Sequence, residues 1–254
     1  LINEVHKPIL AKHGYFISGK YNEFGRNIPY LGLIQAFQQL IRHILTETEG
    51  RIEQWEKKIL RAVGPNGRVI TDVIPELELI IGKQPLVAEL PSQESQNRFN
   101  LCFQNFMRVF PGEKHPLTIF LDDLHWVDLP SLKLFDLFLS DAEIKYILFI
   151  GAYRDNELSA DHPLLTTLND INRKGTTLSR LILPTLTHDN INQLLSETLK
   201  CPAEKTEELA KLCKKRTLGN PLFLKQFLMV LYKDNLFKFD HKQMIWHWEI
   251  DKIG

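Results

Sequence analysis

Two largely apolar runs, at residues 117–121 and 146–152, stand out along the chain. Runs of this kind are typical of strands that are buried on both faces of a parallel sheet. A shorter strand is predicted at residues 15–21, after a glycine turn, and a further short strand at residues 181–183, which Pro184 closes. The pattern therefore indicates a sheet whose central strands are buried.

Between the strands, apolar residues recur every three or four positions, as they do on one face of an α-helix. We expect helices over residues 1–10, 29–45, 54–63, 69–81, 95–110 and 130–139. Residues 82–95 contain two prolines and are expected to form a loop. Strands that alternate with helices predict an α/β fold with a parallel sheet and right-handed crossovers.

The pattern changes after residue 184, and only helices are expected from there to residue 236. These helices cover residues 189–199, 204–214 and 222–231, and residues 237–250 then alternate like a β-hairpin. We therefore divide the chain into an α/β domain at residues 1–184, a small helical subdomain at 185–236, and the truncated start of a further hairpin or winged element at 237–254.

Asp122 and Asp123 directly follow the apolar run at residues 117–121. An acid at the carboxyl end of a parallel strand reaches the crevice in which open α/β sheets bind ligands. We interpret the pair as a Walker B motif, which in nucleotide hydrolases places a carboxylate beside Mg²⁺. The alternative is a strand that ends in a solvated acidic turn, and the two acids alone do not separate these interpretations.

The sequence contains no phosphate-binding loop of the form G-x-x-x-x-G-K-[ST]. In P-loop proteins the N–H groups and lysine of this loop hold the phosphates, and its hydroxyl binds Mg²⁺. The chain begins at Leu1, without methionine and already with helical spacing. We expect a fragment that starts just after the loop and lacks the strand before it. Unpaired strand edges should make this fragment unstable or prone to aggregation.

Composition narrows the possible partners and the compartment. Lys+Arg and Asp+Glu both number 31, so the chain carries no net charge that would attract nucleic acid or membranes. Cys102, Cys201 and Cys213 lack C-x-x-C spacing, which argues against a zinc site and fits a reducing, cytoplasmic compartment. No apolar run reaches the length of about 18 residues that a membrane helix needs. The H-R-D and D-F-G triplets of protein kinases are also absent.

Five segments, taken in order, resemble the AAA-like ATPase domain of STAND-type signalling NTPases. They are residues 17–21, 26–30, 120–126, 150–157 and 219–221, and the resemblance spans nearly the whole chain. It is strongest to the ATPase module of large bacterial multi-sensor kinases, which lies between a serine/threonine kinase and C-terminal sensor and histidine-kinase domains. The resemblance implies a P-loop NTPase fold, a three-layer α/β structure with a parallel sheet, here truncated at its N-terminus, and a helical subdomain. It also implies ATP and Mg²⁺ as ligands, with fused kinase and sensor domains as partners.

The resemblance implies a role for each residue at the ends of the two central strands. Asp122 would bind Mg²⁺, and Asp123 would take the place of the glutamate that orients the attacking water, so that hydrolysis would be slow. Arg154 would sense the γ-phosphate, because a guanidinium fork suits phosphate oxygens. The plainer alternative for Arg154 is a surface residue paired with Asp155 or Glu157.

Further residues have both a family role and a plainer structural one. Asn220 and Pro221 match a segment that packs against adenine, yet they also suit the start of a helix. His125, Trp126 and Asp128 follow the acids and would form a mobile loop, or alternatively a core tryptophan beside a solvated histidine.

The leading hypothesis is a regulatory module in which ATP and Mg²⁺ bind between the sheet and the helical subdomain and bias their relative position. No Asn-Lys-x-Asp stretch of the guanine-reading kind is present, which favours ATP over GTP. Without the phosphate loop the fragment itself should be inactive. The alternatives are a protein-interaction scaffold that does not hydrolyse ATP, and the ATPase domain of a DNA-binding transcriptional regulator or replication initiator.

Overall fold

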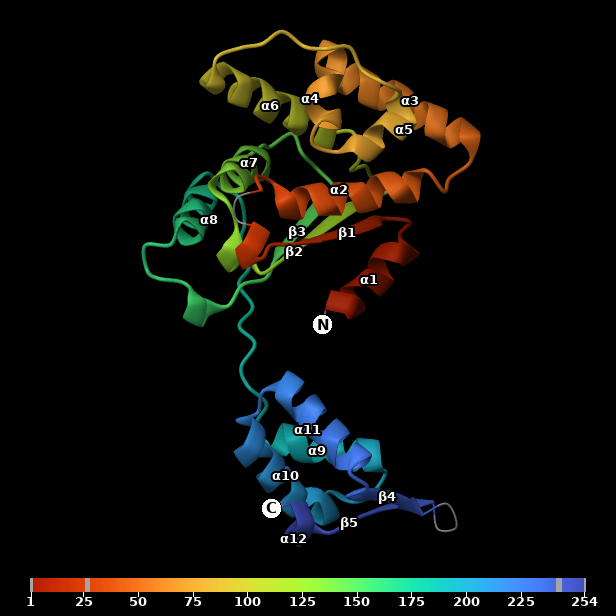
Figure 1. Ribbon diagram of the computed structural model, residues 1–254, viewed down its shortest axis with the longest axis vertical. Coiled ribbons are helices and arrows are strands. Elements are labelled where there is room, and N and C mark those ends of the chain that lie inside the picture. The colour runs from red at the N-terminus through yellow and green to blue at the C-terminus, as the bar shows by residue number, and fades with distance from the viewer. Residues whose placement is uncertain (1, 26–27, 241–243, 254) are drawn as a thin grey trace. The chain divides into compact units, whose positions relative to one another are not determined.

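The computed structural model describes residues 2–25, 28–240 and 244–253. Arg26 and Asn27, which belong to one of the segments that carry the family resemblance, lie outside the described residues, as does His241 in the expected hairpin. The chain forms two compact units, Leu1–Leu178 and Ser179–Gly254, each with a hydrophobic core of its own (Figure 1).

The first unit contains a parallel sheet of three strands in the order β1-β2-β3. The strands are β1 (Tyr15–Lys20), β2 (Leu117–Asp122) and β3 (Ile147–Gly151). The central strand β2 is the most deeply buried, because Leu117, Ile119 and Leu121 are fully inaccessible to solvent. The register pairs Lys20 with Asp122, so the carboxyl ends of β1 and β2 lie at the same edge of the sheet.

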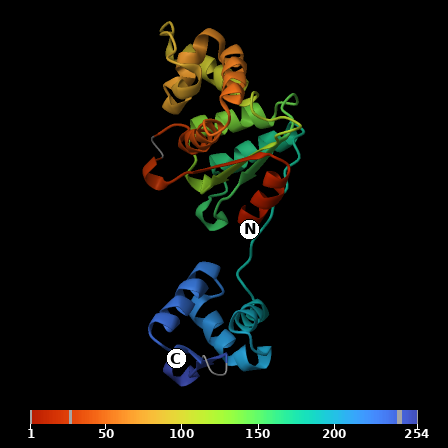
Figure 2. The same cartoon turned by 90° about the vertical axis from the view of Figure 1, so that its right-hand side faces the viewer.

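Helices surround this sheet and extend the first unit on one side. They are α1 (Ile2–Ala11), α2 (Leu31–Ile44), α3 (Glu49–Val63), α4 (Gly67–Thr71), α5 (Glu78–Ile81), α6 (Ser92–Met107), α7 (Leu129–Leu139) and α8 (Pro163–Arg173). Helices α1 and α2 pack on opposite faces of the sheet (Figure 2). This is the α/β architecture with a parallel sheet that the alternation of apolar patterns predicts, and it is consistent with the P-loop NTPase fold that the family resemblance implies.

Helices α3 to α6 gather beyond α2 (Figure 1). Aromatic side chains pack between several of these helices and α2. Phe37 of α2 lies with its ring 5.6 Å from that of Phe103 and 5.4 Å from that of Phe106, both on α6. Trp55 of α3 stacks on Phe110 at 5.7 Å. Each buried aromatic side chain stabilises the fold by about 1.5–3 kcal/mol through removal of apolar surface from water.

The outer edge of β1 is covered by side chains of α2. The N–H group of Lys20 donates to Oε1 of Gln35 at 2.9 Å, and the N–H group of Ser18 donates to Oε1 of Gln39 at 3.0 Å. The two glutamines are one helical turn apart and therefore lie on the same face of α2. They satisfy edge groups that would otherwise be open to pairing with another strand.

The second unit is helical and ends in a hairpin. It contains α9 (His188–Leu199), α10 (Ala203–Thr217), α11 (Pro221–Lys233), β4 (Phe237–Asp240), β5 (Ile245–Trp248) and α12 (Ile250–Ile253). Strands β4 and β5 are antiparallel, as the alternating pattern predicts. Phe237 and Ile253 join the core that α9 and α10 form with Leu224 of α11, so the hairpin packs on the helices.

Three details of the sequence prediction are wrong or incomplete. The expected helix at residues 69–81 is interrupted after α4, because Pro75 starts a separate turn and has no N–H group to continue the helix. Helix α8 was not expected at all. Residues 181–183 form no strand, since none of β1, β2 and β3 pairs with them and their side chains remain 65–71% exposed.

Helix α2 begins at Leu31, two residues later than the position of Pro29 suggests. Tyr30 has a left-handed backbone conformation, with φ 65°, and separates the proline from the first helical residue. The proline therefore lies before the helix and not in its first turn.

Candidate functional site

The two acids lie where β2 ends. Asp122 is the last residue of β2, and its Oδ1 accepts the N–H group of Asp123 at 2.9 Å. Asp123 adopts a left-handed conformation, with φ 53°, which turns the chain out of the strand. The side chain of Asp122 is 39% exposed and that of Asp123 is 17% exposed. Both carboxylates therefore lie at the carboxyl edge of the sheet, and that of Asp122 is open to a ligand.

Lys20 belongs to the same site, although the sequence analysis gave it no role. Its Nζ lies 2.8 Å from Oδ2 of Asp123 and 3.6 Å from Oδ2 of Asp122. The hydrogen bond to Asp123 raises the pKa of the Lys20 ammonium group. The sequence did contain a signal, because Lys20 lies near the end of a predicted strand that precedes an acid-ended strand in a parallel sheet.

Gly14, Gly19 and Lys20 have the G-x-x-x-x-G-K spacing of a phosphate loop, but Tyr21 replaces its hydroxyl residue. In the structure Tyr15–Lys20 is strand β1. Its Ser18 and Lys20 N–H groups donate to the glutamines of α2, and the strand pairs with β2 along its other edge. A phosphate loop instead points successive N–H groups into one concave site. Lys20 is therefore a cation at the end of a strand and not the lysine of a phosphate loop.

Arg154 follows β3 and has a side chain that is 62% exposed. Its Nη1 donates to Oε1 of Glu157 at 2.7 Å, which is the plainer pairing considered from the sequence. The pKa of Arg154 is raised, chiefly by Glu157 and further by the negative charges of Asp123 and Asp122. The guanidinium group therefore lies within the electrostatic field of both acids.

His125 is buried, with a side chain that is 1% exposed, so the expectation of a solvated histidine is wrong. It lies in the 3₁₀ turn Leu124–Trp126, which follows the two acids. Its Nε2 is 3.0 Å from Oε2 of Glu157 and 4.0 Å from Oδ1 of Asp123. Trp126 is half-buried beside it, with ring centroids 5.3 Å apart.

Asp128 is buried and fixed, which corrects the expectation of a mobile loop at this position. Its Oδ1 accepts the N–H group of Ser131 at 2.8 Å and so caps the first turn of α7. Its Oδ2 accepts the Ser131 hydroxyl at 2.7 Å and the N–H group of Tyr30 at 3.2 Å. Tyr21 donates its hydroxyl to Oγ of Ser131 at 3.1 Å. This Asp128 network connects the chain after β1, the start of α2 and the start of α7.

The acids suit a divalent cation with few protein ligands. Oδ2 of Asp122 has its nearest cation, Lys20, at 3.6 Å, which leaves the carboxylate able to coordinate. Among the described residues, no group of three or more His, Cys, Asp and Glu side chains forms a metal cluster. Mg²⁺ commonly binds through one or two carboxylates together with substrate phosphates and water, and Asp122 and Asp123 fit that description.

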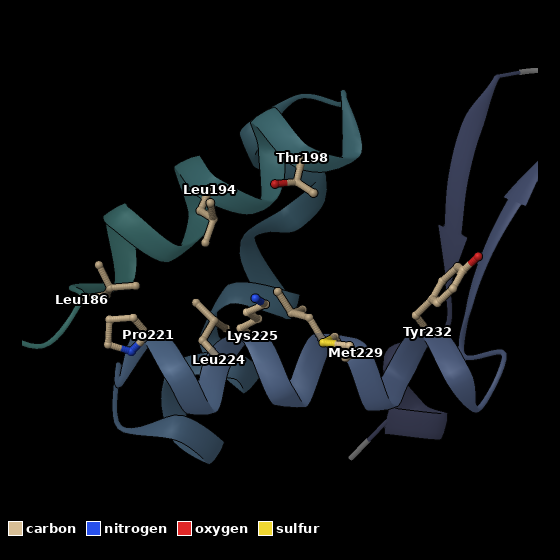
Figure 3. A pocket seen from close by; sticks show the side chains of 9 residues that line it. Leu186, Leu194, Thr198, Pro221, Leu224, Lys225, Met229 and Tyr232 are labelled. Atoms are coloured by element: carbon tan, nitrogen blue, oxygen red, sulfur yellow. The ribbon is translucent and has the colours of Figure 1, made fainter. Parts of the chain in front are cut away.

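Asn220 and Pro221 belong to the second compact unit, which is described by itself. Oδ1 of Asn220 accepts the N–H groups of Leu222 at 2.9 Å and Phe223 at 3.3 Å, so Asn220 is the N-cap of α11. Pro221 is the first residue of α11 and lines an apolar groove of about 460 Å³ between α9 and α11 (Figure 3). The structure thus shows the plainer role of both residues at a helix start.

A family model described as an AAA ATPase domain matches residues 1–150, more than half of the chain. The chain belongs to the AAA ATPase family. The match includes β1 and β2, and with them Lys20, Asp122 and Asp123. No solved structure matches the chain significantly.

The relatives of this AAA ATPase domain include several signalling kinases. Hybrid signal transduction histidine kinase G of Dictyostelium discoideum is 30% identical over 316 residues, which cover 100% of this chain and 9% of that protein. Peroxide stress-activated histidine kinase mak2 of Schizosaccharomyces pombe is 30% identical over 263 residues, which cover 96% of this chain and 11% of that protein. Histidine protein kinase 1 of Candida albicans is 24% identical over 64% of the chain. The chain thus spans about a tenth of the length of these relatives.

None of the helices in the described part of the AAA ATPase chain is long and apolar enough to cross a membrane. This agrees with the absence of a long apolar run in the sequence.

Proposed function

We propose that this AAA ATPase domain binds ATP with Mg²⁺ and acts as a nucleotide switch inside a larger signal-transduction protein, a multi-sensor serine/threonine and histidine kinase. The observation that carries the proposal is the grouping of Lys20, Asp122 and Asp123 at one edge of a parallel sheet, with Arg154 in their electrostatic field. Carboxylates there suit a cation, and the two basic side chains suit phosphates. The names of the relatives support a place in kinase signalling.

Each residue has a distinct role in the proposal. Asp122 holds Mg²⁺, which neutralises charge on the phosphates of the nucleotide when it is bound. Asp123 orients the attacking water, and its short side chain together with its ion pair to Lys20 makes hydrolysis slow. Arg154 exchanges its partner Glu157 for the γ-phosphate and so reports whether that phosphate is present.

The proposed domain organisation keeps the sequence-based boundaries. Residues 1–184 form the nucleotide-binding domain, residues 185–236 the helical subdomain, and residues 237–254 the start of a further element. In this proposal Pro221, together with the preceding Asn220, packs against adenine. The position of the helical subdomain then depends on the nucleotide. The proposed compartment is the cytoplasm. No direct contact of these residues with nucleic acid is proposed, in keeping with their net charge of zero.

A scaffold that does not hydrolyse ATP is the second candidate. Two observations favour it, because Asp123 is engaged by Lys20 and Arg154 is engaged by Glu157. In that case the charged groups at the sheet edge would stabilise one another and contribute nothing to turnover.

The test is Asp122→Asn in the full-length protein, with fluorescent ATP as the ligand. We expect Mg²⁺-dependent binding to weaken at least about tenfold, since loss of a charged partner at a site costs on the order of 1.5–3 kcal/mol. Asp136→Asn is the matched control, because Asp136 is 32% exposed and pairs with Lys174, which directly follows α8. Unchanged Mg²⁺-dependent binding in Asp122→Asn would refute the assignment, and binding without measurable turnover would favour the scaffold.

A further inference from the structure

The two carboxylate oxygens of Glu157 contact two different side chains, those of Arg154 and His125. Oε1 accepts a hydrogen bond from Nη1 of Arg154 at 2.7 Å, while Oε2 lies 3.0 Å from Nε2 of His125. The residue ends the 3₁₀ turn Asp155–Glu157 after β3, and its side chain is 30% exposed. One partner, Arg154, is on the surface and the other, His125, is buried, so the two contacts differ in how easily they can be exchanged.

His125 is the buried partner of Glu157. Its ring is inaccessible to solvent, and in the described structure neither ring nitrogen has a partner with hydrogen-bond geometry. The short distance to Glu157 is therefore a close polar contact and not a well-directed hydrogen bond. This contact uses the second carboxylate oxygen of Glu157, so it does not depend on whether Arg154 stays paired.

Arg154 can leave Glu157 at small cost. Ion pairs between exposed side chains are weak, and the Arg154 side chain is 62% exposed. A guanidinium group binds carboxylate and phosphate with the same fork of N–H donors, so the two anions compete for it directly. A terminal phosphate beside Mg²⁺ carries more negative charge than the carboxylate and would win this competition.

We propose that Glu157 is a positioning residue that holds Arg154 when no γ-phosphate is present and releases it when ATP binds. Glu157 thereby sets how strongly the site distinguishes ATP from ADP. The competition requires that Arg154 reads the γ-phosphate, and it therefore rests on the proposed function.

The experiment measures the dissociation constants of ATP and ADP, with Mg²⁺, for the full-length protein and its Glu157→Gln variant. The neutral amide keeps the size of the side chain but weakens its hold on Arg154. We expect the ratio of the ADP constant to the ATP constant to rise about threefold, the size that an exposed ion pair allows. The affinity for ADP should stay the same, since ADP has no phosphate that reaches Arg154.

Asp155→Asn is the matched control, because Asp155 lies in the same turn and accepts the N–H group of Asn156. It removes one negative charge from the turn and should leave the ratio unchanged. An equal shift in Asp155→Asn would show a general charge effect and would overturn the role of Glu157. An unchanged ratio in Glu157→Gln, or parallel changes for ATP and ADP, would overturn it as well.

Arg154→Gln separates failure of this inference from failure of the proposed function. If it leaves the ratio unchanged, Arg154 does not sense the γ-phosphate and both proposals fail at that point. If it lowers the ratio while Glu157→Gln has no effect, only the competition by Glu157 is wrong. In the double variant, the effect of Glu157→Gln should vanish, because the side chain for which it competes is absent.

Discussion

Gly19 lies at a close approach between strand β1 and helix α2. A Cβ atom on Gly19 would meet the carbonyl oxygen of Gly32 at 1.8 Å and its carbonyl carbon at 2.6 Å. Both are backbone atoms, so the clash cannot be relieved by turning a side chain. The glycine is therefore required for packing, and it also fixes the strand that ends in Lys20.

Gly19→Ala should lower the free energy of unfolding of the first unit by about 3 kcal/mol, as overpacking of a tight core does. Urea denaturation followed by tryptophan fluorescence measures this. Gly50→Ala is the control, since nothing lies within 4 Å of a Cβ atom at that helical position and alanine should change stability by at most about 1 kcal/mol. Equal stability of the two variants would contradict the close approach.

The cysteines differ in their surroundings and should differ in reactivity. Burial raises the pKa of the Cys102 thiol to about 11 and that of the Cys213 thiol to about 12, whereas Cys201 is only half-buried. The thiolate is the reactive form, and a raised pKa depletes it at neutral pH. We expect a thiol reagent at pH 7.5 to modify Cys201 alone in the folded protein. The modification of Cys201 should appear as a fast phase of the reaction, and Cys201→Ser should abolish it. Fast modification that persists in this variant would contradict the burial of Cys102 and Cys213.

At the scale of elements, the glutamines of α2 close the outer edge of β1. Replacement of both Gln35 and Gln39 by alanine would leave the N–H groups of Lys20 and Ser18 without these partners. We expect a loss of about 1–2 kcal/mol in stability and greater self-association, because open strand edges pair with one another. Sedimentation velocity measures the association. Gln93→Ala with Gln104→Ala, on α6, changes two glutamines away from the strand and should not increase it.

Most elements follow from local pattern, and so does the break in the expected helix at Pro75, whereas the wrong strand at residues 181–183 depends on partners that are distant in sequence. Strands β1, β2 and β3 have apolar runs that identify them without knowledge of their neighbours. Residues 181–183 have a similar run, but a strand also needs a partner, and local sequence does not reveal whether one is available.

The candidate site follows the same rule. Asp122 and Asp123 were found because they end an apolar run. Lys20 was overlooked because its proximity to them depends on the register of two strands that are almost a hundred residues apart. The burial of His125 depends on how the turn Leu124–Trp126 packs against the rest of the unit, and no periodicity in the sequence encodes that.

For the whole molecule, the two compact units have separate cores, and residues 176–187 between their helices form neither helix nor strand. Leu181 in this segment is 71% exposed and is followed by Ile182, whereas the bond after Leu183 precedes Pro184 and resists chymotrypsin. Brief digestion with chymotrypsin should therefore cut after Leu181 and release a stable C-terminal fragment, since each unit retains its own core. Mass spectrometry of the fragments identifies the cut, and earlier cleavage inside α9 or α10 would contradict a separate second unit.

The Asp128 network has a consequence for how a ligand would bind. Because Asp128 and Ser131 tie together the chain after β1 and the starts of α2 and α7, that side of the sheet edge is already rigid before any ligand arrives. The turn that carries Arg154 and Glu157 is the exposed part of the same edge. The conformational entropy lost on binding in the first unit should therefore come mainly from a few residues after β3, and the rest of the edge acts as a preformed template.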